Sequence, residues 1–156
     1  MTTEECNLLI NKALSKVQIN IEESCLEAII SESQGHPYIL ESLGYVLHID
    51  LAEDDKILTT KNLESSMPAI MGFLANEFFA VIYSKLSPNA KKILVEIAKQ
   101  DKIVQSELAK RCNKSSGYLG PYLTELVQKE AITKVERGEY KIFHNLFAKY
   151  VLSLPQ

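Results

Sequence analysis

The chain has 156 residues, of which 46% are apolar and 24% are charged, and its net charge is −3. This composition predicts a folded core in one ordinary domain or two small ones, and it excludes a disordered chain. Cys6, Cys25 and Cys112 are odd in number and far apart, which excludes a disulfide framework and a paired-cysteine zinc site. We expect them to be small buried apolar residues.

The charge changes sign at Leu86-Ser87-Pro88-Asn89. Residues 1–86 carry five Lys against thirteen Asp and Glu, a net charge of −8, whereas residues 87–156 carry twelve Lys and Arg against seven Asp and Glu, a net charge of +5. This asymmetry predicts two modules with different partners, the second basic enough to bind a polyanion. The alternative interpretation is that the charges only keep both modules soluble.

The sequence favours a cytoplasmic protein without a membrane partner. No segment approaches the run of about 18 uninterrupted apolar residues that a membrane span requires. The first residues, Met1-Thr2-Thr3-Glu4-Glu5, are acidic, whereas a signal peptide begins with basic residues.

The acidic half is predicted to contain four helical segments. Thr2-x-x-Glu5 has the form of a capping box, and Asn20-x-x-Glu23 is predicted to open the second helix in a similar way. Gly35 is predicted to end that helix, and Pro37 to occupy the first turn of the third.

A polar stretch around Glu53-Asp54-Asp55-Lys56 predicts a loop before the fourth helical segment. That segment begins near Thr59-Thr60 and continues to about residue 84. Because Pro68 lacks an amide hydrogen, we expect a kink there or two shorter helices.

The basic half has the element order of a winged helix-turn-helix. Ser87-Pro88 predicts an N-cap and the first helical residue, and a short second helix carries Leu108, Ala109 and Cys112. A turn at residues 113–116 leads to a third helix with Leu119, Leu123 and Leu126 on its buried face. Two alternating runs around Arg137-Gly138 predict a hairpin, and a last helix covers Leu146 to Leu152. Helix, short helix, turn, helix and hairpin are the elements of that fold.

The run Ser33-Gln34-Gly35-His36-Pro37-Tyr38-Ile39-Leu40-Glu41-Ser42-Leu43-Gly44 resembles the lid of archaeal STAND-type ATPases, relatives of the AAA+ proteins, whose helical lid carries a Gly-x-Pro motif. In that family a winged helix follows the lid, and residues from Leu86 through Phe143-His144-Asn145-Leu146-Phe147-Ala148 look like that module. The resemblance implies a mainly α chain with a helical lid bundle at 1–84, followed by a winged helix-turn-helix with a small β-hairpin at 87–156.

The sequence contains no Gly-x-x-x-x-Gly-Lys-Ser/Thr loop and no apolar strand ending in Asp-Asp or Asp-Glu. These elements hold phosphates and magnesium in such ATPases, so we expect no catalysis by this chain. The resemblance implies the regulatory C-terminal region of a longer ATPase, with its upstream core as partner and ATP bound there. A free-standing small DNA-binding regulator with an acidic helical interaction domain is the alternative.

The resemblance also implies a nucleotide contact at Gly35, His36 and Pro37, where the proline side of the turn would pack against adenine. No Arg or Lys stands beside the motif to reach a phosphate, as one does in many AAA+ relatives. The alternative is that glycine and proline only punctuate two helices. His36, His48 and His144 lack metal-ligand spacing, so no metal site is predicted.

Candidate nucleic-acid contacts surround the predicted recognition helix. This helix would enter the major groove, with basic and polar side chains at its start and one cation at the wing tip. They are Lys110, Arg111, Lys114, Ser115, Ser116, Tyr118, Tyr122 and Arg137. The first turns of the helix contain no Arg, Asn or Gln to read bases, and Gly120-Pro121 weakens its start. Double-stranded DNA and a protein partner therefore both remain open.

Overall fold

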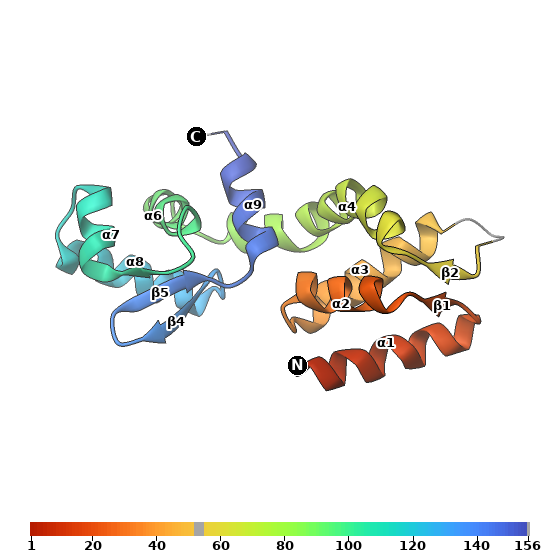
Figure 1. The fold of residues 1–156 in the computed structure, drawn as a ribbon. Coiled ribbons are helices and arrows are strands. Elements are labelled where there is room, and N and C mark those ends of the chain that lie inside the picture. The colour runs from red at the N-terminus through yellow and green to blue at the C-terminus, as the bar shows by residue number, and fades with distance from the viewer. Residues whose placement is uncertain (52–54, 156) are drawn as a thin grey trace. The chain divides into compact units, whose positions relative to one another are not determined.

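A computed structural model describes residues 1–51 and 55–155 of the chain (Figure 1). The described residues form mainly helices, with two small sheets. They divide into two compact units, Met1–Leu74 and Ala75–Gln156, which are described separately below.

The described residues of the first unit form four helices and one pair of very short strands. Its elements are α1 (Thr3–Val17), β1 (Asn20–Ile21), α2 (Glu23–Ser33), α3 (Pro37–Asp50), β2 (Ile57–Leu58) and α4 (Thr60–Leu74). Helix α3 packs against α2 and α4, and β1 pairs with β2 in parallel. The core is formed by apolar side chains that include Ile39, Leu43 and Ile70, each of them fully buried.

The capping box at the start of α1 is confirmed, because the Thr2 side chain accepts from the Glu5 amide and the Glu5 side chain accepts from the Thr2 amide. The capping box predicted at Asn20-x-x-Glu23 is wrong. Asn20 lies in β1, where its amide donates to Lys56 O over 2.8 Å, and Glu22 is the N-cap of α2 without a side-chain cap bond. Asn20 and Ile21 pair with Ile57 and Leu58, and a local sequence pattern does not reveal pairing with residues so far along the chain.

Helix α2 ends in two left-handed residues, Gln34 at φ 48° and Gly35 at φ +71°. Pro37 occupies the first turn of α3, as predicted. Of the loop predicted around residues 53–56, Glu53 and Asp54 lie outside the described residues, whereas Asp55 and Lys56 are in neither helix nor strand. Helix α4 continues through Pro68 as far as Leu74. The α-helix is interrupted only after Leu74, where a π-helical segment follows at Ala75–Phe79.

The second unit begins with a π-helical segment and contains a three-stranded sheet. Its elements are η1 (Ala75–Phe79), α5 (Ala80–Ser84), α6 (Pro88–Ala98), β3 (Ile103–Val104), α7 (Gln105–Cys112), α8 (Ser116–Gln128), β4 (Ile132–Glu136), β5 (Glu139–Ile142) and α9 (Asn145–Ser153). The sheet has the order β3-β5-β4 with antiparallel pairing. The hairpin is confirmed, with Gly138 at φ +75° in its turn.

The second unit has the winged-helix-like order predicted from the sequence. Ser87 caps α6 by accepting from the Ala90 amide, and Leu119, Leu123 and Leu126 of α8 are buried. Strand β3, which pairs with β5, was not predicted, because two residues are too few to show an alternating pattern.

The division between the units falls earlier than the predicted boundary at residues 84–87. Phe79 is fully buried, and its ring centroid lies 5.4 Å from that of Phe147 and 5.7 Å from that of Tyr150. Because these aromatic contacts tie η1 to α9, the residues from Ala75 onward belong to the second unit.

Among the described residues, one helical stretch, Thr60–Ser84, is long and apolar enough by length and composition to cross a membrane. Asn76 and Glu77 interrupt this stretch, so it is not a run of about 18 uninterrupted apolar residues. Its mean hydropathy is 1.3 over an 18-residue window, of which 28% is buried. Core helices of soluble proteins meet the same criterion, and Leu63, Ile70 and Leu74 of this stretch are core residues of the first unit.

Cys6 and Cys25 are fully buried, as predicted, whereas Cys112 is half-buried near the end of α7. Burial, with the nearby Glu22 carboxylate as a second cause, raises the pKa of the Cys25 thiol to about 11. In the part of the chain that the structure describes, no group of three or more His, Cys, Asp or Glu side chains could hold a metal ion.

Candidate binding surface of the second unit

The turn between α7 and α8 presents the start of α8 to solvent. Asn113 ends α7 in a left-handed conformation, and the Ser115 hydroxyl accepts from the Tyr118 amide as the N-cap of α8. The Gln105 side-chain amide donates to the Ser116 carbonyl over 2.9 Å, which ties the beginning of α7 to the beginning of α8. Lys114, Ser115 and Ser116 are exposed on this turn. The cap residues predicted from the sequence therefore hold the candidate recognition helix in place.

Two tyrosines and one lysine form a continuous group at the start of α8. The ring centroids of Tyr118 and Tyr122 lie 5.2 Å apart, and the Lys114 ammonium lies 5.0 Å from the centroid of the Tyr118 ring. Asn89 of α6 donates to the Tyr122 hydroxyl over 2.9 Å. Hydrogen bonding to Tyr122 is the main cause that raises the pKa of Tyr118.

The basic candidates differ in how strongly they are already paired. Lys110 and Arg111 are exposed in the last turn of α7, and Arg111 Nε lies 3.3 Å from the Glu107 carboxylate. Arg137 is exposed in the hairpin turn between β4 and β5. An exposed ion pair four residues apart on a helix is weak, so Arg111 could exchange its partner for a phosphate at small cost.

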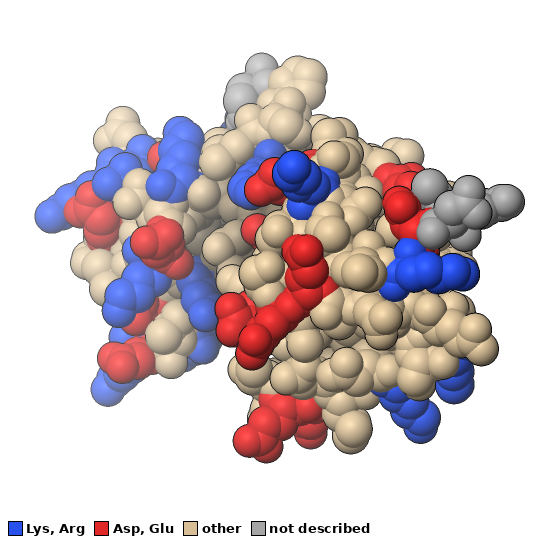
Figure 2. All heavy atoms as spheres, turned by 45° about the vertical axis from the view of Figure 1, so that its right-hand side comes forward, with Lys and Arg blue, Asp and Glu red and all other residues tan. Residues whose placement is uncertain are grey.

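Figure 2 shows basic side chains spread over the part of the visible face that the second unit forms, with acidic side chains interspersed. Lys134 and Lys141, which are not among the predicted contacts, are exposed on β4 and β5. The alternating pattern of the hairpin places such residues on its surface, and counting cations along the hairpin would have found them.

The exposed residues of the first two turns of α8 are small or aromatic. Ser116, Gly117, Tyr118 and Pro121 are exposed, and no side chain among residues 116–122 carries a charge or an amide. A Cβ atom added at Gly117 or Gly120 would meet nothing within 4 Å. This helix face exposes tyrosine rings and backbone at its glycines, and it has no Arg, Asn or Gln side chain that could make bidentate hydrogen bonds to a base pair.

The residues that the resemblance assigns to nucleotide lie in the first unit, at the junction of α2 and α3. The Met1 ammonium donates to the Gly35 carbonyl over 2.9 Å, and a Cβ atom at Gly35 would lie 2.4 Å from the Met1 carbonyl oxygen. His36 is the N-cap of α3 without a side-chain cap bond, and Pro37 is exposed beside it. Met1 therefore covers the glycine side of this turn.

Residues 76–151 match a protein-family model described as a domain of unknown function, DUF8462. This match covers slightly less than half of the chain and has nearly the same bounds as the second unit. No curated protein matches.

Among solved structures, two variants of RuvB from Thermotoga maritima are similar to this chain, each at 19% sequence identity and with TM-scores of 0.39 and 0.40. In both comparisons 99% of this chain is covered, and the chain spans 50% of the length of the RuvB chain.

Proposed function

We propose that this chain is a non-catalytic regulatory region of a cytoplasmic STAND-type ATPase, and that its winged-helix-like unit binds double-stranded DNA through the phosphate backbone. The observation that carries the DNA part is the exposure of Lys110, Lys114 and Arg137 around the α7–α8 turn and the hairpin turn. These elements contact the groove and its edges when such a fold binds DNA. Lysine and arginine at these places supply affinity without reading sequence.

The regulatory part of the proposal rests on residues 33–44, which resemble the lid motif, and on the lack of a phosphate-binding loop in the sequence. In the intact protein, ATP held by an upstream core would move the lid, and the lid would move the DNA-binding unit. The mass of the polypeptide isolated from its native source tests this. A native product of about 17.6 kDa would instead support a free-standing regulator.

DNA binding is tested by a fluorescence anisotropy titration with a short labelled duplex at low salt. Neutralisation of about three phosphates gives a log-log salt slope of about −3, so binding should be weak and largely lost as salt is raised. We expect little difference among duplex sequences. The double variant Lys114→Glu, Arg137→Glu should abolish binding and leave the fold intact, because both side chains are exposed.

The matched control is the double variant Lys12→Glu, Lys16→Glu, which makes the same change of net charge on exposed residues of α1. It should bind the duplex as the unmodified chain does. Equal binding by the Lys114→Glu, Arg137→Glu variant, or no duplex binding by the unmodified chain, would refute the DNA proposal.

A protein partner is the second candidate, and the uncharged aromatic start of α8 favours it. Tyrosine supplies large contact area at low entropic cost, and it is enriched in protein interfaces. A chain that binds no duplex, but loses capture of a specific partner when Tyr118 is replaced by Ser, would support this candidate.

A further inference from the structure

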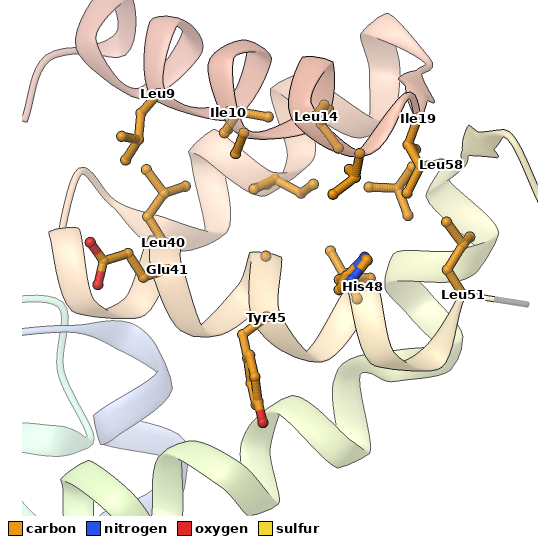
Figure 3. Close-up of a pocket in the computed structure, with 15 residues that line it drawn as sticks. Leu9, Ile10, Leu14, Ile19, Leu40, Glu41, Tyr45, His48, Leu51 and Leu58 are labelled. Carbon is orange, nitrogen blue, oxygen red and sulfur yellow. The ribbon is translucent and has the colours of Figure 1, made fainter. Parts of the chain in front are cut away.

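The first unit contains an apolar pocket of about 420 Å³ between α1 and α3 (Figure 3). This volume lies within the range of about 300–1,000 Å³ that small-molecule sites occupy. Nearly all of its lining is aliphatic or aromatic. The lining includes Leu9 and Leu14 of α1, Ile29 of α2, Leu40 and Leu47 of α3, and Leu58 of β2.

The pocket exists because α1 is held at its two ends. At its beginning the Met1 nitrogen donates to the Gly35 carbonyl, and after its end β1 pairs with β2 through residues such as Asn20, whose amide donates to Lys56 O. Between these ends Cys6 is the one buried side chain of α1. Leu9 is 39% exposed although it faces Leu40 across the pocket (Figure 3). The apolar face of α1 therefore spans the pocket without filling it.

We propose that this pocket binds an elongated apolar small molecule that carries a protonated amine at one end. Figure 3 shows lining side chains distributed along α3, from Leu40 and Glu41 at one end to Leu51 at the other. An unbranched aliphatic chain fits such a slot. A peptide helix is about 10–12 Å across with its side chains, so it is too large to be enclosed in a space of this volume.

The amine is inferred from charge complementarity. Among the lining residues that the structure describes, Glu41 carries the one carboxylate; it is exposed at the rim of the pocket near the beginning of α3, and in Figure 3 its carboxylate extends outward from the space between α1 and α3. His48 is exposed further along the same helix. Residues 1–86 carry a net charge of −8, which raises the local concentration of cations and lowers that of anions. The same apolar chain with a carboxylate in place of the amine should bind more weakly.

Gly44 allows the pocket to be blocked without a clash. It lies in α3 and lines the pocket, and a Cβ atom added there would meet nothing within 4 Å. Gly44→Leu therefore places a side chain at the pocket and replaces a residue with poor helix propensity by a good one. Gly72→Leu is the matched control, because Gly72 lies inside α4 of the same unit, meets nothing within 4 Å and does not line the pocket.

Isothermal titration calorimetry of the whole chain with octylamine, octanoate and 1-octanol tests the proposal. We expect octylamine to bind most tightly, and Glu41→Gln to weaken its binding about two- to five-fold without weakening that of 1-octanol. Gly44→Leu should abolish binding of octylamine and Gly72→Leu should leave it unchanged.

Octanoate binding as tightly as octylamine would overturn the assignment of the amine, and so would an unchanged affinity in Glu41→Gln. Octylamine binding that survives Gly44→Leu would overturn the assignment of the pocket. If the unmodified chain does not bind octylamine, the proposal is overturned and the pocket is empty. If the chain sediments as a dimer that Gly44→Leu dissociates, the proposal is also overturned, because a second copy of the chain occupies the pocket. These outcomes do not depend on duplex binding, which belongs to the other unit.

Discussion

Single residues decide several local features of this protein, and Gly35 is the clearest case. Its φ of +71° is strained for any residue with a Cβ atom, and the Met1 carbonyl occupies the place where that atom would lie. Gly44 and Gly72, in contrast, are helical residues with free space around them. Glycine is therefore required by the backbone at position 35, whereas a larger residue fits at positions 44 and 72.

We predict that Gly35→Ala destabilises the chain by about 1–2 kcal/mol, since the left-handed conformation costs roughly that much with a side chain present. The control Gly44→Ala should stabilise it by up to about 1 kcal/mol, because alanine has the better helix propensity. Urea unfolding followed by circular dichroism measures both. Equal effects of the two substitutions would show that the turn is not constrained as described.

The thiols provide a prediction on pH. The pKa of Cys25, about 11, is raised above the value of about 9 of an unburied thiol, so the unfolded chain loses this proton first as pH rises. The associated stabilisation is complete below about pH 9 and disappears as pH approaches about 11. Stability in urea should fall between these pH values.

Replacement of Cys25 by Ala should remove that part of the pH dependence. Iodoacetamide at pH 8 should label half-buried Cys112 before fully buried Cys25. Faster labelling of Cys25, or an unchanged pH profile in the Cys25→Ala variant, would contradict the burial of this thiol.

At the scale of elements, α1 and α3 differ in how they are held. Helix α1 buries Cys6 alone, whereas α3 buries Ile39, Leu40, Ser42, Leu43, Val46 and Leu47. Few buried apolar contacts mean a low free energy of local opening. Native contacts at its ends, and not a packed face, keep α1 in place.

Hydrogen exchange followed by mass spectrometry should therefore show faster exchange of amides in α1 than in α3. Saturating octylamine should slow exchange in α1, since a ligand between the two helices would have to be released before α1 opens. Exchange in α9 of the other unit serves as the internal control. Equal protection of α1 and α3 in the free chain would refute the loose packing of α1.

At the scale of the molecule, the second unit has its own core, and η1 belongs to it. The rings of Phe78 and Phe79 contact Phe143, and Phe79 also contacts Phe147 and Tyr150. In addition, the Glu125 carboxylate accepts from the Ser87 amide over 2.6 Å and from the Ser87 hydroxyl over 2.8 Å. The segment around the predicted boundary is thus bonded into the second unit.

We predict that a fragment of residues 75–156 unfolds cooperatively and that a fragment of residues 87–156 is several kcal/mol less stable, because loss of one buried Phe alone costs about 3–5 kcal/mol. Thermal unfolding followed by circular dichroism compares them. In the whole chain, Phe79→Ala provides the same comparison without truncation. Equal stability of the two fragments would place the boundary at 84–87, where the charge changes sign.

The sequence by itself determined the mainly helical class, the capping box at Thr2, the N-cap at Ser87 and the order of helices and hairpin in the second unit. Each of these depends on neighbours within a few residues, so a local pattern is sufficient. Three other features depend on residues far along the chain. They are the pairing of β1 with β2, the place of Asn20 in that pairing and the burial of Phe79 in the core of the second unit. Only the tertiary structure decided them, because contact energy between distant segments leaves no local period.

The candidate sites divide in the same way. Exposed cations at the α7–α8 turn and the hairpin turn follow from composition and from the predicted turns, so the sequence was sufficient to name them. The amphipathic pattern of α1 could not reveal a pocket, since apolar residues at helical spacing look the same whether a facing helix fills the space or leaves it open. Tertiary packing alone decided that the space between α1 and α3 remains unfilled.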